Sequence, residues 1–497
     1  MKKILLVGLA TSILLVGYNG NSDKKEVAKI HSAPSDNLTL KIYNWEDYIN
    51  TDEETGELLM IEKFKDYYYE TYGVTPDVRY YTFDTNETMY NNVFSDINEQ
   101  YDLICPSDYI IEKLMKTDRD GDGLSDLIEE IDLDRIPNYR DNVSPYLHNV
   151  FKDNGFDKYS VGYMWGTMGL TYYEGAYETI NEDIKSWDVL WNSNYKNKIS
   201  VKDSMRDTYV VGIMSVYKEA LDMARQLNEE GKIDDEYYKN LVQEYFDRHD
   251  DKTLEKVERA LKDLKKNIYG FEVDSGKYDV VTGKVDINLA WSGDAVESID
   301  TALEETPDRP LKYYVPDEGS NVWFDGWIMP KGANKELAYE FLNFISNPEN
   351  AVENMDYIGY TTFIGGDAVK DYISESYCEV EEGVETITKD LTFYFTDDPE
   401  SERIVFEYPK SEEYGRFDTQ FPDEEILKKC AIMHDFGEAN NRVVEMWTRV
   451  LSSELNATSY IFLGILVLGI IGYCIYFAVK KQGNKKRRSR RLAERKL

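Results

Sequence analysis

Strand patterns and helix patterns alternate along most of this 497-residue chain. Apolar and polar residues alternate in 38–43, whereas apolar residues recur at helical spacing in 60–72. The other strand patterns are 77–81, 101–106 and 285–291, and the other helix patterns are 217–266 and 335–346. Such alternation predicts α/β units with parallel sheets. Ligands of these sheets bind at the carboxyl ends of strands, so the residues after each strand pattern are the first place to search for a site.

Acidic residues stand in five short segments, several of them at predicted strand ends, and four of the five also contain aromatic residues. The segments are Tyr43-Asn44-Trp45-Glu46-Asp47-Tyr48, Pro106-Ser107-Asp108-Tyr109, Asp203-Ser204-Met205-Arg206-Asp207, Trp291-Ser292-Gly293-Asp294 and Trp323-Phe324-Asp325. Carboxylates pair with ammonium groups, and aromatic faces attract cations and pack on methylene groups. A single tryptophan is more often a core residue than a ligand contact, but five such segments together favour a site for an alkyl diamine.

The charge of the chain is large and unevenly distributed. Net charge is −37, although the last eighteen residues hold ten Lys or Arg and a single acid, Glu494. Such an acidic body argues against binding to nucleic acid, whose phosphates would repel it. It attracts cationic ligands, although the acidity can equally serve only to keep a surface protein soluble.

The N-terminal segment 1–22 resembles a signal peptide. Lys2 and Lys3 precede an uncharged run, 4–17, which is too short for an ordinary membrane span. The sequence Leu15-Val16-Gly17-Tyr18 resembles a lipoprotein cleavage box with tyrosine in place of the lipidated cysteine. A lipid anchor is therefore not expected, removal of the segment is left open, and 23–37 follows as a polar linker.

A second apolar segment near the C-terminus predicts a transmembrane helix. Residues 460–479 are twenty uncharged, mostly apolar residues, the length that a helix needs to cross a bilayer. The basic tail 480–497 is then cytoplasmic by the positive-inside rule, and the body of the chain lies outside the cell membrane or in a periplasm. A buried core helix is the alternative interpretation.

Taken in order, the motifs resemble those of the spermidine/putrescine-binding proteins of bacterial ABC transporters, within the extracellular solute-binding protein family. The resemblance extends from about Leu38 to Leu451. It rests on the 43–48 segment, Asn86-Glu87-Thr88-Met89-Tyr90, Tyr101-Asp102-Leu103-Ile104-Cys105-Pro106-Ser107, Trp187 with Leu190-Trp191, Trp323-Phe324-Asp325 and Ile358-Gly359-Tyr360.

The resemblance implies a two-lobed α/β clamshell of the periplasmic-binding-protein type, joined by hinge strands. Crossings between the lobes are expected near Thr167, Phe324 and Asp367. The first lobe would then contain 38–167 and 325–367, and the second lobe 168–324 and 368–456.

The resemblance also implies which residues contact the ligand. The expected set is Trp45, Asp47, Tyr48, Ser107, Tyr109, Asp207, Trp291, Trp323, Asp325 and Tyr360. Within it, Asp325 and Asp47 would bind ammonium groups, and Trp291 and Trp323 would enclose the aliphatic chain. One departure affects the charge of the site, because Ser204 stands where the family has an acid and Asp203 is displaced by one position.

The function that follows is capture of a polyamine for an ABC permease and its ATPase, with the lobes closing on the ligand. An enzyme is not expected. The four histidines, His31, His148, His249 and His434, have no recognisable nucleophile or metal motif beside them. A clamshell receptor or sensor for another small solute is the alternative.

A separate motif at 118–129 fits the twelve-residue calcium loop. Acids stand at positions 1, 3, 5, 9 and 12, and Gly123 stands at position 6. The predicted calcium ligands are Asp118, Asp120, Asp122, the carbonyl of Leu124, Asp126 and Glu129. A structural Ca²⁺ in the first lobe is the prediction, and a solvated acidic turn is the alternative.

The region before the apolar segment carries two features without an assigned role. Cys378 and Cys430 could form a disulfide in this compartment, which the sequence leaves open. The stretch 366–436 is longer and more acidic than the family resemblance leads us to expect.

Overall fold

The computed structural model describes residues 33, 37–52, 54–95, 100–452 and 473. The signal-like segment 1–22, most of the linker and the basic tail 480–497 lie outside the described residues. The predicted span 460–479 does so too, apart from Tyr473. Within the described part of the chain, no helix is long and apolar enough to cross a membrane.

The first sheet contains three parallel strands from the N-terminal part of the chain. Its order is β2-β1-β3, with β1 at Thr39–Trp45, β2 at Asp77–Phe83 and β3 at Leu103–Ile104. Helix α1 (Leu59–Tyr72) follows β1 and buries an apolar stripe that includes Phe64. These elements confirm the first three strand patterns and the first helix pattern.

One long strand, β4 (Val161–Tyr173), connects this part of the molecule to a second group of strands. Thr167 pairs with a residue of β9 (Val322–Trp327), whereas Met168 pairs with a residue of β7 (Ile287–Trp291). The change of partner lies where the first crossing between lobes was expected. We refer to the β1–β3 side as the first lobe and to the β5–β8 side as the second lobe.

The second sheet is mixed. Its order is β10-β4-β7-β5-β6, with β8 and β9 also paired to β4. The remaining strands of this sheet are β5 (Ile199–Lys202), β6 (Gly270–Glu272), β8 (Leu311–Tyr314) and β10 (Thr361–Thr362). β5 is parallel to both β6 and β7, so the carboxyl ends of these three strands meet at one edge. β7 confirms the strand pattern at 285–291.

The predicted helical region 217–266 is three helices rather than one. They are α8 (Lys218–Glu229), α9 (Asp235–Phe246) and α10 (Asp251–Lys265). Asp234 and Asp250 each accept backbone hydrogen bonds as N-caps, which start new helices at α9 and α10. The pattern of 335–346 is confirmed by α13 (Lys335–Ile345).

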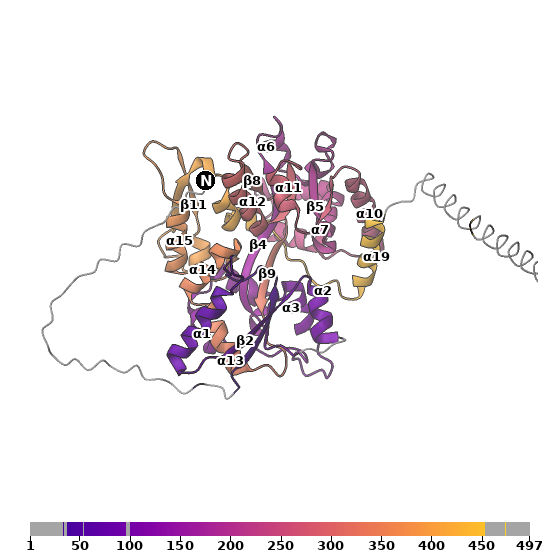
Figure 1. Cartoon of the computed structure of the whole chain (residues 1–497). Coiled ribbons are helices and arrows are strands. Elements are labelled where there is room, and N and C mark those ends of the chain that lie inside the picture. The colour runs from indigo at the N-terminus through magenta and orange to yellow at the C-terminus, as the bar shows by residue number, and fades with distance from the viewer. Residues whose placement is uncertain (1–32, 34–36, 53, 96–99, 453–472, 474–497) are drawn as a thin grey trace, which may run out of the picture.

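Figure 1 shows the arrangement of the two lobes. α1, β2 and α3 lie at one end of the molecule, β5, α7 and α12 lie at the other, and β4 runs between them. Further helices of the first lobe are α2 (Asn86–Tyr90), α3 (Asp108–Met115), α4 (Pro137–Asn142), α5 (Pro145–Asp153) and α14 (Pro348–Ile358). Those of the second lobe are α6 (Ile180–Asp183), α7 (Met205–Val216), α11 (Gly276–Val281), α12 (Ser292–Glu305) and α19 (Asn440–Leu451).

The region after Asp367 does not belong to the second lobe alone, which differs from the expectation for 368–456. Its elements are α15 (Asp367–Tyr377), β11 (Thr386–Asp390), α16 (Thr392–Phe395), β12 (Val405–Pro409), α17 (Arg416–Gln420) and α18 (Glu424–Leu427). α15 packs on α14 and α16 packs on α5, both in the first lobe, whereas α17 packs on α12 and α19 on α10 in the second. The cause is aromatic burial: Phe393 packs edge-on against Tyr146 of α5, and Tyr394 stacks on Trp165.

Cys378 and Cys430 are both free thiols in the structure, so they do not form the disulfide that the sequence left open.

Candidate functional site

A buried carboxylate, Asp325, lies on a strand that pairs with β4. It is in β9 and only 6% exposed. The hydroxyl of Tyr48 donates to its Oδ2 at 2.8 Å, whereas Oδ1 is buried and accepts no hydrogen bond within the described residues. Burial raises the pKa of Asp325 to about 6, and the nearby Ser107 side chain and the hydrogen bond from Tyr48 oppose that rise. An unsatisfied buried oxygen of this kind favours a cationic partner.

Three aromatic rings surround this carboxylate. Tyr48 and Trp323 both meet the ring of Tyr360 edge-on, with centroids 5.7 Å and 5.1 Å away. Gly293 allows the position of Tyr360, because a Cβ at residue 293 would lie 2.3 Å from the Tyr360 ring. Tyr48, Trp323, Asp325 and Tyr360 thus lie together, and we call them the hinge group.

A second set of predicted residues lies in the second lobe. Asp207, in the first turn of α7, is 5% exposed and accepts a hydrogen bond from the indole of Trp291 at 3.3 Å. Burial raises the pKa of Asp207. Ser204 is the N-cap of α7 and accepts from the backbone N–H of Asp207, while Asp203 is exposed. Asp207 is therefore the buried acid of this segment.

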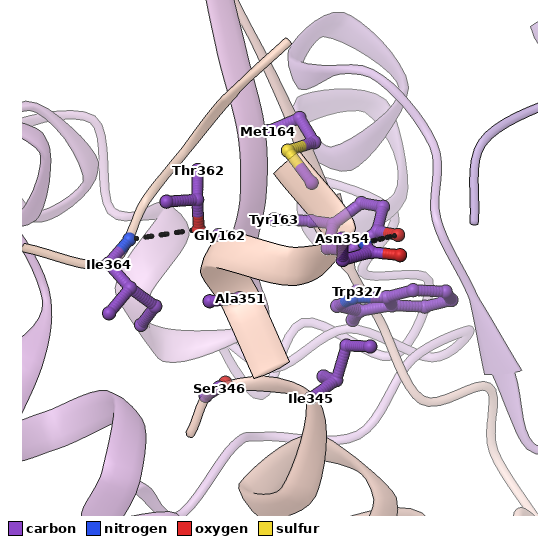
Figure 2. A pocket seen from close by; sticks show the side chains of 10 residues that line it. All are labelled: Gly162, Tyr163, Met164, Trp327, Ile345, Ser346, Ala351, Asn354, Thr362 and Ile364. Atoms are coloured by element: carbon purple, nitrogen blue, oxygen red, sulfur yellow. Dashed lines mark hydrogen bonds between the residues drawn. The ribbon is translucent and has the colours of Figure 1, made fainter. Parts of the chain in front are cut away.

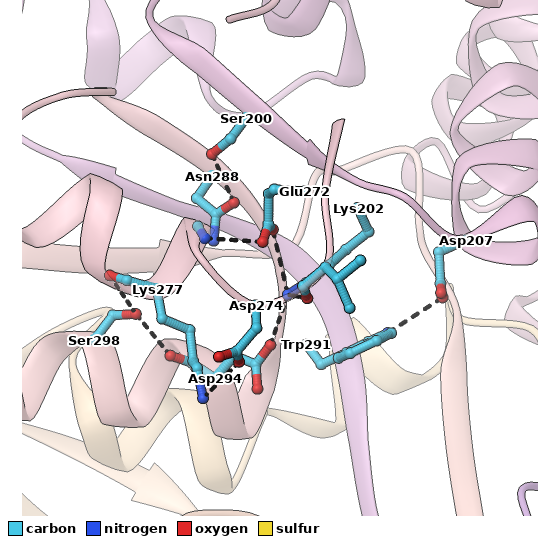
Figure 3. A network of polar contacts seen from close by, with 12 residues as sticks. Ser200, Lys202, Asp207, Glu272, Asp274, Lys277, Asn288, Trp291, Asp294 and Ser298 are labelled. Carbon is cyan, nitrogen blue, oxygen red and sulfur yellow. Dashed lines mark hydrogen bonds and ion pairs between the residues drawn. The ribbon is translucent and has the colours of Figure 1, made fainter. Parts of the chain in front are cut away.

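Lys202 and Asp294 connect the two sets. Lys202 stands outside the five segments noted in the sequence, and Asp294 was noted only as part of the segment 291–294. The Lys202 ammonium lies 2.8 Å from Asp294 Oδ2, and the hydroxyl of Tyr360 donates to Asp294 Oδ1 at 2.8 Å. The same ammonium lies 4.7 Å from the centroid of the Trp291 ring. Figure 3 shows this network, with Lys202 between Asp294 and Trp291 and the indole directed toward Asp207.

The environment of Lys202 keeps it charged. Its side chain is 1% exposed, and its ammonium also approaches Glu272 at 3.3 Å and the carbonyl of Val273 at 3.2 Å. Burial acts to lower the pKa of Lys202, but Asp294 and Glu272 outweigh it and raise that pKa. The available signal in the sequence was a lysine ending an apolar strand immediately before the segment 203–207.

Ser107 and Tyr109 form a third set beside the hinge group. Ser107 forms a backbone bridge with Asp325, and the Asn86 amide donates to Ser107 Oγ at 3.0 Å and to the Tyr109 hydroxyl at 2.9 Å. The Arg206 guanidinium lies 3.6 Å from the centroid of the Tyr109 ring, so a residue of the second lobe covers this ring of the first. Asn86 and Arg206 had been noted only as parts of motifs.

Trp45 and Asp47 do not join these sets directly. Trp45 packs on Phe83 with centroids 4.6 Å apart. Its indole N–H is buried and has no hydrogen-bond partner within the described residues. Asp47 is exposed in a left-handed turn (φ 50°) and, among the described residues, forms no hydrogen bond or ion pair with the other predicted ligand contacts.

A small cavity behind Tyr48 is not the ligand site. It measures about 10 Å³, which is room for roughly one water molecule. Figure 2 shows that Tyr163, Trp327 and Asn354 line it. The hydroxyl of Tyr163 donates to the carbonyl of Tyr48 at 2.8 Å, so this packing holds Tyr48 in position from behind.

The predicted calcium loop is only partly assembled. Carboxylate oxygens of Asp118, Asp120 and Asp122 lie within 4.8 Å of one another. Leu124 and Asp126 are in the same loop, where Asp126 accepts from the backbone N–H of Arg119 at 2.6 Å.

Glu129, the predicted twelfth-position ligand, is not in this group. Its carboxylate pairs with Lys335 at 2.8 Å and with Lys331 at 3.4 Å, and both lysines are far from Glu129 in the sequence. The three grouped acids provide the hard oxygen donors that Ca²⁺ prefers, so the loop residues fit the ion in part.

Comparison with known proteins places the chain in a family. The family model of bacterial extracellular solute-binding proteins matches residues 108–368, more than half of the chain. The spermidine/putrescine-binding periplasmic protein of Salmonella typhimurium is 28% identical over 329 residues, which cover 66% of this chain and 78% of the relative. The putrescine-binding periplasmic protein SpuD of Pseudomonas aeruginosa is 25% identical over 354 residues, covering 69% and 82%.

Solved structures show the same fold. The crystal structure of the spermidine/putrescine ABC transporter substrate-binding protein PotD from Streptococcus pneumoniae, in complex with calcium and HEPES, matches with a TM-score of 0.55. It is 26% identical, and the match covers 83% of this chain and 98% of that one. The TpPotD lipoprotein of Treponema pallidum matches with a TM-score of 0.56 at 19% identity, covering 83% and 99%. These likenesses bear out the two-lobed α/β fold, and these relatives are binding proteins rather than enzymes. The chain belongs to the bacterial extracellular solute-binding protein family.

Proposed function

We propose that the chain is the extracellular substrate-binding subunit of a polyamine ABC importer. The observation that carries this proposal is Asp325, a buried carboxylate that has one oxygen without a hydrogen-bond partner among the described residues. It shares the hinge group with the rings of Tyr48, Trp323 and Tyr360. An ammonium group would satisfy that oxygen, and the rings would cover the methylene groups next to it. The names of the relatives, which bind spermidine and putrescine, support the same ligand class.

The two lobes contribute different parts of the site. Asp325 and Tyr48 would hold one ammonium, while Asp207 and Trp291 of the second lobe would hold the other end of the ligand. A ligand that contacts both lobes stabilises the closed state relative to the open one. The closed complex would then be the form that delivers the polyamine to a permease and its ATPase.

Calorimetry of the full chain in detergent with putrescine, spermidine and spermine tests this function, with Asp325→Asn as the variant. Removal of the charge is expected to weaken binding roughly 100-fold, about 3 kcal/mol, because the ligand ammonium loses its buried partner. Asp66→Asn is the matched control, since Asp66 is an exposed acid on α1 of the same lobe, and should change affinity less than about three-fold. If the wild type binds none of the three, the proposal is wrong and a receptor or sensor for another solute takes its place.

We also propose that the segment 460–479 tethers the protein to the cell membrane, with the basic tail in the cytoplasm. The support is the sequence, which has twenty uncharged residues followed by a strongly basic stretch. α19 ends at Leu451 and packs on α10, so the tether would leave from the second lobe. Extraction of membranes with alkaline carbonate should leave the protein in the membrane fraction; release into the supernatant would contradict the tether.

Finally, we propose that the loop 118–129 binds Ca²⁺. Asp118, Asp120 and Asp122 would supply the first oxygens. The carbonyl of Leu124, Asp126 and Glu129 would complete the set once Glu129 leaves its two lysines. Calorimetry with CaCl₂ should show one site in the wild type and none in the double variant Asp120→Asn, Asp122→Asn. If the wild type shows no heat of binding, the proposal is wrong.

A further inference from the structure

The second-lobe end of the site already contains a positive charge. The Lys202 ammonium has a carboxylate at 2.8 Å, a second at 3.3 Å, a backbone carbonyl at 3.2 Å and an indole ring with its centroid at 4.7 Å. A carboxylate pair, a carbonyl acceptor and an aromatic face are the contacts that a buried alkylammonium requires. Lys202 is therefore bound by its own protein in the way that a ligand ammonium would be.

This ammonium lies within the proposed ligand site rather than apart from it. Asp294, its nearest partner, accepts from the hydroxyl of Tyr360 in the hinge group. Trp291, whose ring it approaches, donates to Asp207. Figure 3 shows the Lys202 ammonium beside Asp294, with the Trp291 indole directed toward Asp207.

The pairing of Lys202 limits how many charges remain for a ligand. Asp294 is taken up by Lys202 and Tyr360, and Glu272 also pairs with Lys202 and accepts the backbone N–H of Gly276 at 2.8 Å. Asp325 and Asp207 form no ion pair with a lysine or arginine among the described residues, although Lys202 and Arg206 act on Asp207 from a greater distance. Burial raises the pKa of a third carboxyl, Asp108, to about 8, so this group is mostly uncharged at pH 7. Two buried carboxylates can compensate two ammonium groups of the ligand. A third ammonium group would face Lys202 in a site from which water is largely excluded.

We propose that Lys202 is a built-in ammonium that occupies one cation position, so that the site selects a diamine of the putrescine type against triamines and tetramines. This inference rests on the proposed function, since it assigns the ligand class within the same site. Asp325 and Asp207 hold the two ends of the diamine, and the ring of Trp291 is shared between the ligand and the Lys202 ammonium.

Calorimetry of the full chain with putrescine and spermidine tests the selection. The wild type is expected to bind putrescine at least about ten-fold more tightly than spermidine, because like charges brought together in a buried site strongly weaken binding. In Lys202→Met, which removes the ammonium and keeps the length of the side chain, that ratio should fall by about ten-fold or more in favour of spermidine.

Lys284→Met is the matched control. Lys284 pairs with Asp279 at 2.8 Å and its side chain is 44% exposed, so the variant removes the same charge from the same lobe without vacating the position of Lys202. The putrescine-to-spermidine ratio should stay within about two-fold of the wild type.

The outcomes separate this inference from the proposed function. If the wild type binds no polyamine, both this inference and the proposed function are wrong. The inference alone is wrong if the wild type binds spermidine as tightly as putrescine, or if Lys202→Met and Lys284→Met give the same putrescine-to-spermidine ratio. If Lys202→Met fails to fold in a thermal melt, Lys202→Arg retains the charge and should keep the preference for putrescine. Loss of that preference in a folded Lys202→Arg protein would also contradict the inference.

Discussion

Two buried carboxylates of the candidate site, Asp325 and Asp294, differ in how their charge is compensated. At the hinge end, Asp325 has one hydrogen bond, a pKa raised to about 6 and one oxygen without a partner among the described residues. At the second-lobe end, Asp294 is held by Lys202 and Tyr360, and its pKa is lowered. Burial alone therefore does not identify a ligand contact. A buried carboxylate without an internal cation is ready for a ligand, whereas one with an internal cation contributes mainly to stability.

The largest expected effect on the free energy of unfolding comes from replacing each of these two aspartates with asparagine. Asp294→Asn leaves the buried Lys202 ammonium with Glu272 as its only carboxylate, and the free energy of unfolding should fall by about 3 kcal/mol. Asp325→Asn removes an uncompensated charge, so the free energy of unfolding should stay the same or rise. Urea unfolding of both variants without ligand measures this, and equal destabilisation of the two would remove the contrast.

A smaller effect is expected from Gly293→Ala. The new Cβ would lie 2.3 Å from the ring of Tyr360, which must move and weaken its hydrogen bond to Asp294. Overpacking of this kind costs about 2 kcal/mol in the free energy of unfolding. Polyamine affinity should fall as well, because Tyr360 belongs to the hinge group. Gly270→Ala is a suitable reference, since no atom lies within 4 Å of its added Cβ and its backbone is not left-handed, and it should leave affinity unchanged.

The dependence of binding on pH should report the hinge end. Because the pKa of Asp325 is about 6 in the free protein, its carboxyl is charged at pH 7 and mostly protonated at pH 5. Affinity for a diamine should therefore fall about ten-fold between pH 7 and pH 5. Calorimetry at both values checks this, and an equal loss in Asp325→Asn would show that another group is responsible.

The same carboxyl affects folding with the opposite sign. Its folded pKa is raised above the ordinary value of 3.8, so the native state binds more protons than the unfolded state between about pH 4 and pH 6. Its contribution to stability is therefore present below pH 4 and is lost as the pH rises through 6. Asp325→Asn should remove this contribution from the pH profile of unfolding.

The smallest effect concerns Ser204, which stands where the family resemblance led us to expect an acid. Because Ser204 caps α7, Ser204→Ala should lower the free energy of unfolding by about 1 kcal/mol. Putrescine affinity should change less than about two-fold. A large loss of affinity with unchanged stability would instead make Ser204 a ligand contact.

Local patterns predicted most of the fold and the hinge group. The strands β1, β2 and β7 and the helices α1 and α13 follow patterns within a few residues, and Trp323, Asp325 and Tyr360 belong to motifs that can be recognised in isolation. The division of 217–266 into three helices had a local signal too, in the capping residues Asp234 and Asp250.

What the sequence did not predict depends on residues far apart in the chain. Lys202 belongs to the candidate site only because Asp294 and Glu272 come to the same sheet edge. Glu129 lies apart from the other acids of the predicted calcium loop because it pairs with Lys331 and Lys335. The region after Asp367 likewise follows aromatic partners in the first lobe, such as Tyr146 and Trp165. No spacing within a short segment contains this information.

The strand β4 also has a mechanical consequence. It is continuous from one lobe to the other, so rotation between the lobes requires torsion of its backbone near Thr167 and Met168, where its partners change. Gly166 and Gly169 flank that point, and a Cβ at either would lie within 2.6 Å of neighbouring side chains. Glycine there keeps the strand close to its neighbours and lowers the resistance of the backbone to twisting. The stiffness of the connection between the lobes is therefore set in part by two residues that touch no ligand.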